Sequence, residues 1–178
     1  HKGSRNLGHR AGLNSIETII DQSIKEKINY LTLFAFSTEN WKRPKKEIDF
    51  LFDLLKVFLT KKIDDLIKKK IKLKFIGELK KIPFKLKTLI TNAEKKTSQN
   101  TIIQVNIALN YGSRSELVNS IKLINKKKLK VNIENIDQNL FTKNMPAIDL
   151  LIRTGNTQRL SNFMLWQLAY TELFFEKK

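Results

Sequence analysis

The sequence predicts an α/β fold, in which a mostly parallel central β-sheet is flanked by helices. Short apolar runs of strand length alternate with longer segments whose apolar residues recur at helical spacing, and this alternation is typical of parallel sheets covered by helices. The chain has 178 residues, of which 41% are hydrophobic, and it shows neither a repeat nor a linker. It is long enough for a sizeable core, so we expect residues 1–178 to form a single domain.

The first half of the chain contains both patterns. Isoleucines from Ile16 to Ile28 recur at helical spacing, and the run Leu31–Phe36 is apolar throughout. Pro44 suits the first turn of a helix because its φ is already close to the helical value. The expected elements are a helix over 14–29, a strand over 31–36, a polar loop over 37–44, a long amphipathic helix over 45–69 and a strand over 71–76.

The second half continues the alternation. Ser113 and Glu116 have the spacing of a capping box, in which the serine caps the start of a helix and the glutamate reaches back to it. The expected elements are helices over 84–98, 114–126, 134–144 and 160–170, and strands over 101–109, over 149–152 and from 173 onward.

Three polar loops follow predicted strands, over residues 37–44, 110–114 and 153–161. In sheets of this kind, ligands bind beyond the carboxyl ends of the strands. Four of the six arginines lie in or beside these loops, namely Arg43, Arg114, Arg153 and Arg159. The planar guanidinium binds phosphate bidentately, so this placement favours a phosphate-bearing small ligand.

The net charge of +17 has a second source, because 28 of the 34 basic residues are lysines. They cluster in runs such as 68–70 and 126–128 beside helical segments, where charge usually marks a solvated face. We expect no nucleic-acid partner, since no nucleic-acid-binding module is recognisable. Without cysteine, disulfides and thiol nucleophiles are excluded. No apolar run has the length of a spanning helix, so we expect a cytoplasmic protein.

The common catalytic and nucleotide-binding motifs are missing: there is no Walker loop, no G-x-G-x-x-G and no G-x-S-x-G. What remains is arginine, serine and asparagine on loops, together with Glu172 near the last strand. This set suits the binding of a diphosphate through Mg²⁺. If the diphosphate is a leaving group, the metal and the basic side chains would stabilise the negative charge that develops on it.

Five segments carry a more specific signal, and together they resemble the cis-prenyltransferases over nearly the whole chain. The segments are Gly8–Gly12 (GHRAG), Phe36–Glu47 (FSTENWKRPKKE), Asn110–Arg114 (NYGSR), Asp149–Gln167 with its RTG and RLSNF sequences, and Ala169–Phe175 (AYTELFF). They occur in the family's order and with family-like spacing.

The resemblance implies that the chain is an isoprenyl transferase that elongates farnesyl diphosphate with isopentenyl diphosphate, using Mg²⁺ and acting as a homodimer. It is greatest to bacterial members, which make undecaprenyl diphosphate, the lipid carrier of cell-wall synthesis. A peripheral membrane contact for product release would then be expected. The family has a sheet of about six strands, and its Asp-Gly-Asn motif, which supplies the main metal ligand, belongs upstream of His1. A C-terminal tail is expected as well, so the chain as given resembles most, but not all, of the catalytic domain.

The resemblance also assigns residues. Arg153, Arg159 and Ser161 correspond to positions that hold the diphosphate of isopentenyl diphosphate. Arg5 and His9 correspond to positions near the allylic diphosphate and the reacting centre, and His9 and Asn40 are the implied catalytic residues. Ser37, Asn40, Trp41 and Arg43 correspond to a substrate-covering loop, although Trp41 could equally be a packing residue. Glu172 corresponds to a position tied to the metal or to the subunit contact.

A growing isoprenoid also needs an apolar tunnel, because burial is worth about 0.8 kcal/mol per methylene-sized group. Candidate wall residues lie on the predicted helices and strands, with ordinary core packing as the first expectation for each. They are Leu51, Leu55, Phe58, Ile103, Val105 and Ile107.

Two alternatives share the predicted fold. One is a non-catalytic partner subunit, and the other is a cis-prenyltransferase that makes a shorter product. An intact Asp-Gly-Asn motif upstream would favour the enzyme, and product chromatography would separate the two chain lengths.

Overall fold

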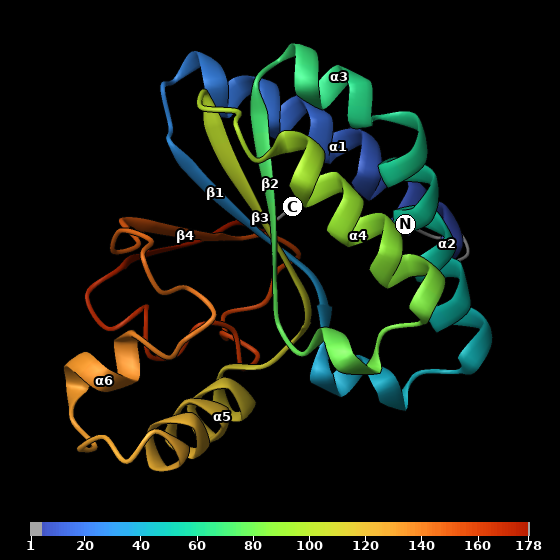
Figure 1. Cartoon of the computed structure of the whole chain (residues 1–178). Helices are drawn as coiled ribbons and strands as arrows, with labels where there is room; N and C mark the ends of the chain where they lie inside the picture. The colour runs from blue at the N-terminus through green and yellow to red at the C-terminus, as the bar shows by residue number, and fades with distance from the viewer. Residues whose placement is uncertain (1–4, 178) are drawn as a thin grey trace. The chain divides into compact units, whose positions relative to one another are not determined.

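A computed structural model describes the backbone of residues 5–177 and the side chains of residues 15–177. The chain divides into two compact units, His1–Asn110 and Tyr111–Lys178, called here the N-terminal and C-terminal units. Each unit contains a parallel strand pair and helices, as Figure 1 shows, which confirms the predicted α/β class. That residues 1–178 act as one domain remains a prediction.

The N-terminal unit holds a three-stranded sheet in the order β1-β3-β2. Strands β2 and β3 are parallel. Strand β1 runs parallel to β3, because hydrogen bonds join the two strands start to start and end to end. Near their starts, the Gln104 amide donates to the Asn29 carbonyl. Beyond the end of β1, the Trp41 indole donates to Asn110 near the end of β3. The elements are α1 (Arg5–Lys25), β1 (Tyr30–Ser37), η1 (Thr38–Lys42), α2 (Lys45–Lys61), α3 (Ile63–Lys68), β2 (Ile71–Ile76), η2 (Leu79–Lys81), α4 (Phe84–Thr97) and β3 (Ile103–Tyr111).

Helices α1 to α4 contact one another and pack against this sheet (Figure 1). A continuous apolar cluster fills the space between helices and strands, with Leu86 and Ile90 of α4 and Ile71 of β2 almost fully buried. Strand β2 alternates buried and half-buried residues, whereas β3 is buried along nearly its whole length, as expected for a central strand.

The C-terminal unit has less regular structure. Strands β4 (Leu150–Arg153) and β5 (Glu172–Phe175) form a short parallel pair, with Leu150 opposite Glu172 and Arg153 opposite Phe175. The helices are α5 (Ser113–Lys126) and α6 (Ile133–Asp137). Turns make up most of the remainder.

The predicted long helix over 45–69 is wrong in one respect, since it is broken at Lys62. That residue has ψ −5°, so the helical path ends there and α3 begins at Ile63. The break allows Ile63 and Leu66 to be buried, and α3 contacts β2. Helix α1 likewise ends before the predicted residue 29, because Lys27 has a left-handed φ of 57°.

Three predictions for the C-terminal unit are also wrong. Residues 160–170 form successive turns rather than a helix, since Ser161, Asn162 and Met164 have left-handed φ values that a right-handed helix cannot include. The helix predicted over 134–144 is the single short element α6.

The third is the capping box, which does not form. Gly112 is the residue before α5, and Ser113 is already helical. The Ser113 hydroxyl instead accepts a hydrogen bond from the Leu165 amide at 2.9 Å. The carboxylate of Glu116 is engaged elsewhere, in a buried network.

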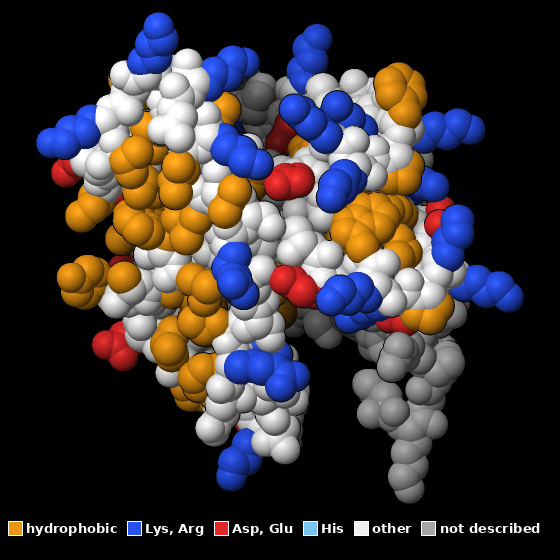
Figure 2. Space-filling model, turned by 90° about the horizontal axis from the view of Figure 1, so that it is seen from below, with side chains coloured by type: hydrophobic (Ala, Val, Ile, Leu, Met, Phe, Trp, Pro, Cys, Tyr) orange, Lys and Arg blue, Asp and Glu red, His pale blue; other side chains and the backbone are white. Residues whose placement is uncertain are grey.

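The lysine runs are solvent-exposed, as predicted for solvated faces. Lys70 and Lys128 adopt left-handed φ values of 51° and 56° just after α3 and α5, so each run includes the residue that ends a helix. In Figure 2, Lys and Arg side chains are scattered over the face shown and do not merge into one continuous patch. No helix in the described part of the chain combines the length and apolarity needed to span a bilayer.

Candidate active site

The predicted substrate-covering loop follows β1 in the N-terminal unit. Ser37 is the last residue of β1, and its amide donates to Asn40 Oδ1 at 2.9 Å. This bond closes the short η1 turn, so Asn40 and Ser37 lie together at the carboxyl end of the strand. That edge is where ligands bind in parallel sheets.

Arg43 lies at the end of the same loop and is held by the following helix. Its Nη1 donates to Glu47 Oε1 at 2.7 Å, and the Glu47 side chain is only 10% exposed. Glu47 lies in the first turn of α2, so this ion pair ties the guanidinium to the start of the helix. The guanidinium remains 36% exposed and accessible to a diphosphate.

Trp41 joins this polar loop to the apolar core. Its indole Nε1 donates to Asn110 Oδ1 at 2.7 Å. Its ring meets Phe36 and Phe52 edge-on, with ring centroids 5.3 and 5.7 Å apart. The residue is half-buried, so it both packs and presents surface.

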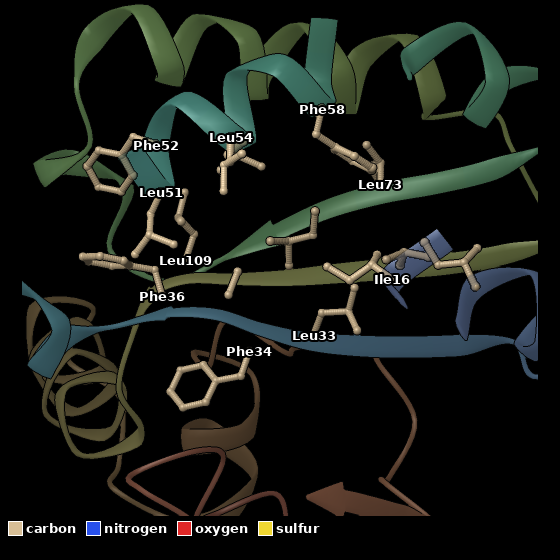
Figure 3. Close-up of a pocket in the computed structure, with 15 residues that line it drawn as sticks. Ile16, Leu33, Phe34, Phe36, Leu51, Phe52, Leu54, Phe58, Leu73 and Leu109 are labelled. Atoms are coloured by element: carbon tan, nitrogen blue, oxygen red, sulfur yellow. The ribbon is translucent and has the colours of Figure 1, made fainter. Parts of the chain in front are cut away.

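An apolar cavity of about 290 Å³ begins at these two phenylalanines. Figure 3 shows side chains from α2 pointing toward side chains of the three strands, with α1 at the other end. Five of the six predicted tunnel residues line it, and Ile103 belongs to the buried core instead. The lining residues are Ile16, Ile20, Leu33, Phe34, Ala35, Phe36, Leu51, Phe52, Leu54, Leu55, Phe58, Leu73, Val105, Ile107 and Leu109.

The C-terminal unit brings together the three residues assigned to the second diphosphate. Arg153 ends β4, and its Nη1 donates to the hydroxyl of Ser161 at 2.8 Å and to the carbonyl of Arg159. Arg159 and Ser161 are exposed, and Arg153 is half-exposed. The loop is thus folded back on the end of its own strand, with a cation and a hydroxyl in contact.

Asn162 fixes this loop to α5. Its Oδ1 accepts from the Arg114 amide at 2.9 Å, and its carbonyl accepts from the Ser113 amide at 2.8 Å. These are two of the four amides that the first turn of any helix leaves unpaired. The left-handed backbone at Ser161 and Asn162 is therefore held by the start of α5.

Glu172 lies apart from that loop. It is exposed at the amino end of β5, three residues before the position that pairs with Arg153. At about 3.3 Å per residue, Glu172 and Arg153 are separated by roughly 10 Å along the strands. Among the described side chains, no three His, Cys, Asp or Glu gather as a metal site. Glu172 offers one exposed carboxylate, which suits Mg²⁺ because this ion commonly takes one or two carboxylates and completes its shell with substrate phosphates.

Arg5 and His9 lie on the first turns of α1, but their side chains are outside the part of the chain whose side chains are described. Their predicted roles at the allylic diphosphate and the reacting centre stay predictions.

A buried polar network in the C-terminal unit was not predicted from the sequence. Glu116 is 1% exposed, and its carboxylate accepts from the Tyr111 hydroxyl at 2.5 Å, the Phe141 amide at 2.8 Å and Gln167 Nε2 at 3.1 Å. Burial and the neighbouring Glu116 raise the pKa of Tyr111 well above its ordinary value, so the hydroxyl stays a donor. The network ties α5 to the segments around residues 141 and 167. Its one visible signal was the Glu116 motif, which we assigned to a cap.

The chain is similar to known proteins in both sequence and structure. Residues 1–178 match the prenyltransferase family model for undecaprenyl diphosphate synthase. The isoprenyl transferase of Campylobacter jejuni is 42% identical over 172 residues, which cover 96% of this chain and 76% of that protein.

Two solved structures are also similar. A probable undecaprenyl diphosphate synthase from Campylobacter jejuni superposes with a TM-score of 0.88 at 42% identity, covering 94% of this chain and 81% of that one. Lavandulyl diphosphate synthase from Lavandula x intermedia, solved with dimethylallyl diphosphate, has a TM-score of 0.90 at 32% identity, covering 97% and 78%. The chain belongs to the undecaprenyl diphosphate synthase family of isoprenyl transferases.

Proposed function

We propose that the enzyme condenses farnesyl diphosphate with successive isopentenyl diphosphate units, releasing diphosphate at each step, and that undecaprenyl diphosphate is its product. The observation that carries this proposal is the apolar cavity of the N-terminal unit, which meets a polar, arginine-bearing loop at Trp41. An allylic diphosphate has the same two parts, a charged head and a hydrocarbon tail.

The cavity explains why the tail would be held. All fifteen lining residues are apolar, and they come from helices and strands that are fixed by the core. Each methylene-sized group buried there would contribute about 0.8 kcal/mol. A lengthening chain is therefore bound more tightly as it grows, and release of the long product becomes a slow step.

The two diphosphates would use different loops. In this proposal, Ser37, Asn40, Trp41 and Arg43 cover the allylic substrate, with Arg5 and His9 from α1. Arg153, Arg159 and Ser161 bind isopentenyl diphosphate through their charge and hydroxyl. Asn40 and His9 act as the catalytic groups, since Asn40 is anchored at the strand edge.

Mg²⁺ would neutralise the departing diphosphate, with Glu172 contributing a ligand or a subunit contact. The homodimer, the cytoplasmic location and the membrane contact for product release complete the proposal as predictions. The homodimer and the membrane contact rest on the family resemblance, and the cytoplasmic location rests on the apolar pattern of residues 1–178.

The test uses the full-length protein with farnesyl diphosphate, labelled isopentenyl diphosphate and Mg²⁺. We expect incorporation of label that depends on the metal, and chromatography should place the product at the undecaprenyl length. A shorter product with the same incorporation would replace the chain-length proposal with that of a shorter-chain enzyme. Absence of incorporation with every allylic primer would contradict the proposed reaction.

A further inference from the structure

Asn110 occupies an unusual position near the carboxyl end of β3. It is only 1% exposed, and its backbone is left-handed, with φ 49°. Asparagine tolerates this conformation better than most residues. A buried polar side chain at the edge where ligands bind needs an explanation.

The Asn110 side chain links two segments that follow other strands. Its Oδ1 accepts from Trp41 Nε1 at 2.7 Å, and its Nδ2 donates to the carbonyl of Glu78 at 2.8 Å. An indole N–H can only donate and a carbonyl can only accept, so these partners fix which way the amide faces. No other uncharged side chain of this length supplies both groups from one planar head.

The backbone reinforces the same junction. The Glu78 amide donates to the Asn110 carbonyl at 3.2 Å. Next to it, a Cβ on Gly77 would lie 2.1 Å from the carbonyl oxygen of Leu109, so the chain just after β2 lies directly against the end of β3. Asn110 therefore holds the segments after β1 and β2 against the end of β3.

We propose that Asn110 is a positioning residue for the substrate-covering loop, and that it acts by fixing Trp41 at the end of the apolar cavity. Because it is buried, it would act through Trp41, whose ring packs on the cavity residues Phe36 and Phe52. The expected change in enzyme kinetics rests on the proposed function, whereas the expected change in the position of Trp41 does not.

The structural consequence is tested by fluorescence. Residues 1–178 contain two tryptophans, so Trp166→Phe leaves Trp41 as the only one in this range, and the experiment uses a protein of these residues or one in which any further tryptophan is also replaced by phenylalanine. In that background, Asn110→Gly keeps the left-handed backbone but removes both side-chain bonds. We expect red-shifted Trp41 emission and an acrylamide quenching constant about twofold larger. Asn110→Asp keeps an acceptor for the indole and should retain emission near that of the Trp166→Phe protein.

The kinetic consequence is a selective change in KM. Loss of one hydrogen bond that positions the loop should raise KM for the allylic diphosphate about threefold to tenfold. KM for isopentenyl diphosphate should change less than twofold. The effects of Trp41→Phe and Asn110→Gly on this KM should be less than additive in the double variant, because both changes remove the same hydrogen bond.

A matched control lies on the same strand. Asn106 is also 1% exposed and hydrogen-bonded, to Thr32 and Gln104, but it lies in the extended part of β3. Asn106→Ala should lower the melting temperature while leaving Trp41 emission and both KM values unchanged.

Two outcomes would overturn the inference. One is that Asn110→Gly leaves Trp41 emission as it is in the Trp166→Phe background. The other is that Asn110→Gly and Asn106→Ala change KM equally. A wild-type protein without transferase activity would instead count against the proposed function, and the fluorescence result would still decide the role of Asn110.

Discussion

The two units are stabilised in different ways. The N-terminal unit is built around one apolar cluster, in which helices α1 to α4 and three strands contribute side chains between Ile16 and Leu109. The C-terminal unit has short strands, and its buried polar residues, Ser113, Glu116, Ser120 and Asn139, include a carboxylate, whereas those described in the N-terminal unit are all uncharged. Six of the nine described non-glycine residues with left-handed φ also lie there.

The difference matches the two halves of the proposed substrates. An apolar cluster can leave an apolar cavity for a hydrocarbon tail. A unit held by directional hydrogen bonds can instead fix a guanidinium and a hydroxyl in a turn, as at Arg153 and Ser161. The comparison predicts that mutations in the loop of Arg153 and Ser161 will affect the binding of isopentenyl diphosphate, and that mutations in the cavity will affect product length.

The largest effect is expected at Arg153. Arg153→Ala removes a charged donor, so kcat/KM for isopentenyl diphosphate should fall about 10- to 100-fold, as for hydrogen bonds worth about 1.5–3 kcal/mol. Arg153→Lys should restore only part of this loss, because it lacks the planar fork. Steady-state kinetics with varied isopentenyl diphosphate measures both. Lys122→Ala, an exposed cation of α5 in the same unit, is the control. Equal kinetics for the Arg153 and Lys122 variants would rule out the assigned role.

The next effect concerns stability. Glu116→Ala leaves the Tyr111 hydroxyl and the Phe141 amide without their acceptor. We expect a loss of about 3 kcal/mol, because a buried unpaired donor costs about 1–3 kcal/mol. This corresponds to a melting temperature lower by about 6–12 °C in circular dichroism. Glu134→Ala, on the exposed side of α6, should change it by less than about 2 °C. Similar melting temperatures for the two variants would show that the network does not stabilise the C-terminal unit.

The cavity gives a third test. Leu54→Phe adds volume to the cavity wall, so the product should become shorter by one or more isoprene units while the first condensation continues. Product chromatography measures this change. Val57→Phe is the control, since Val57 is on the same helix and 49% exposed. An unaltered product length for Leu54→Phe, with the variant folded, would argue that the growing chain does not occupy this cavity.

The smallest effect is a pH dependence in the N-terminal unit. Burial raises the pKa of Glu94 above its ordinary value of 4.5, although the Phe75 amide and Lys74 act in the opposite direction. The folded state therefore holds the proton more tightly than the unfolded state. Stability from this group is fully present below pH 4.5 and is lost as pH rises through the folded pKa.

Glu94→Gln removes this dependence and can still accept from Phe75. The difference in melting temperature, variant minus wild type, should therefore increase by about 1–3 °C from pH 4 to pH 8. Asn92→Gln, a change that involves no titrating group at an exposed position of α4, should show no such trend. A difference for Glu94→Gln that is constant with pH would contradict the raised pKa.

Sequence patterns predicted the N-terminal unit better than the C-terminal unit, and the reason is physical. Apolar spacing reports which residues face a core, so β1, β2, α4 and β3 were placed to within about two residues. The same spacing over 160–170 predicted a helix, because Leu160, Phe163 and Leu168 repeat helically. That pattern carries no information about the side-chain bonds of Asn162 and Ser113 that favour turns.

The site was predicted in a similar way. The family motifs predicted two groups of residues, each on one loop, and the structure contains both groups. One comprises Ser37, Asn40, Trp41 and Arg43, and the other comprises Arg153, Arg159 and Ser161. The partners that hold these residues were not predictable, because they are distant in sequence. Trp41 and Asn110 are 69 residues apart, and Glu116 and Gln167 are 51 residues apart.

Gly77 has a consequence for reading mutational scans. Its φ is +125°, and any side chain would collide with the Leu109 carbonyl, so every substitution must move the chain after β2 away from the end of β3. That movement would disturb the amide of Glu78, and through it Asn110. A scan that scores only activity would therefore rank position 77 with the catalytic residues, although glycine has no group that could take part in the reaction. Activity scores near this strand edge will report chain geometry as strongly as chemistry.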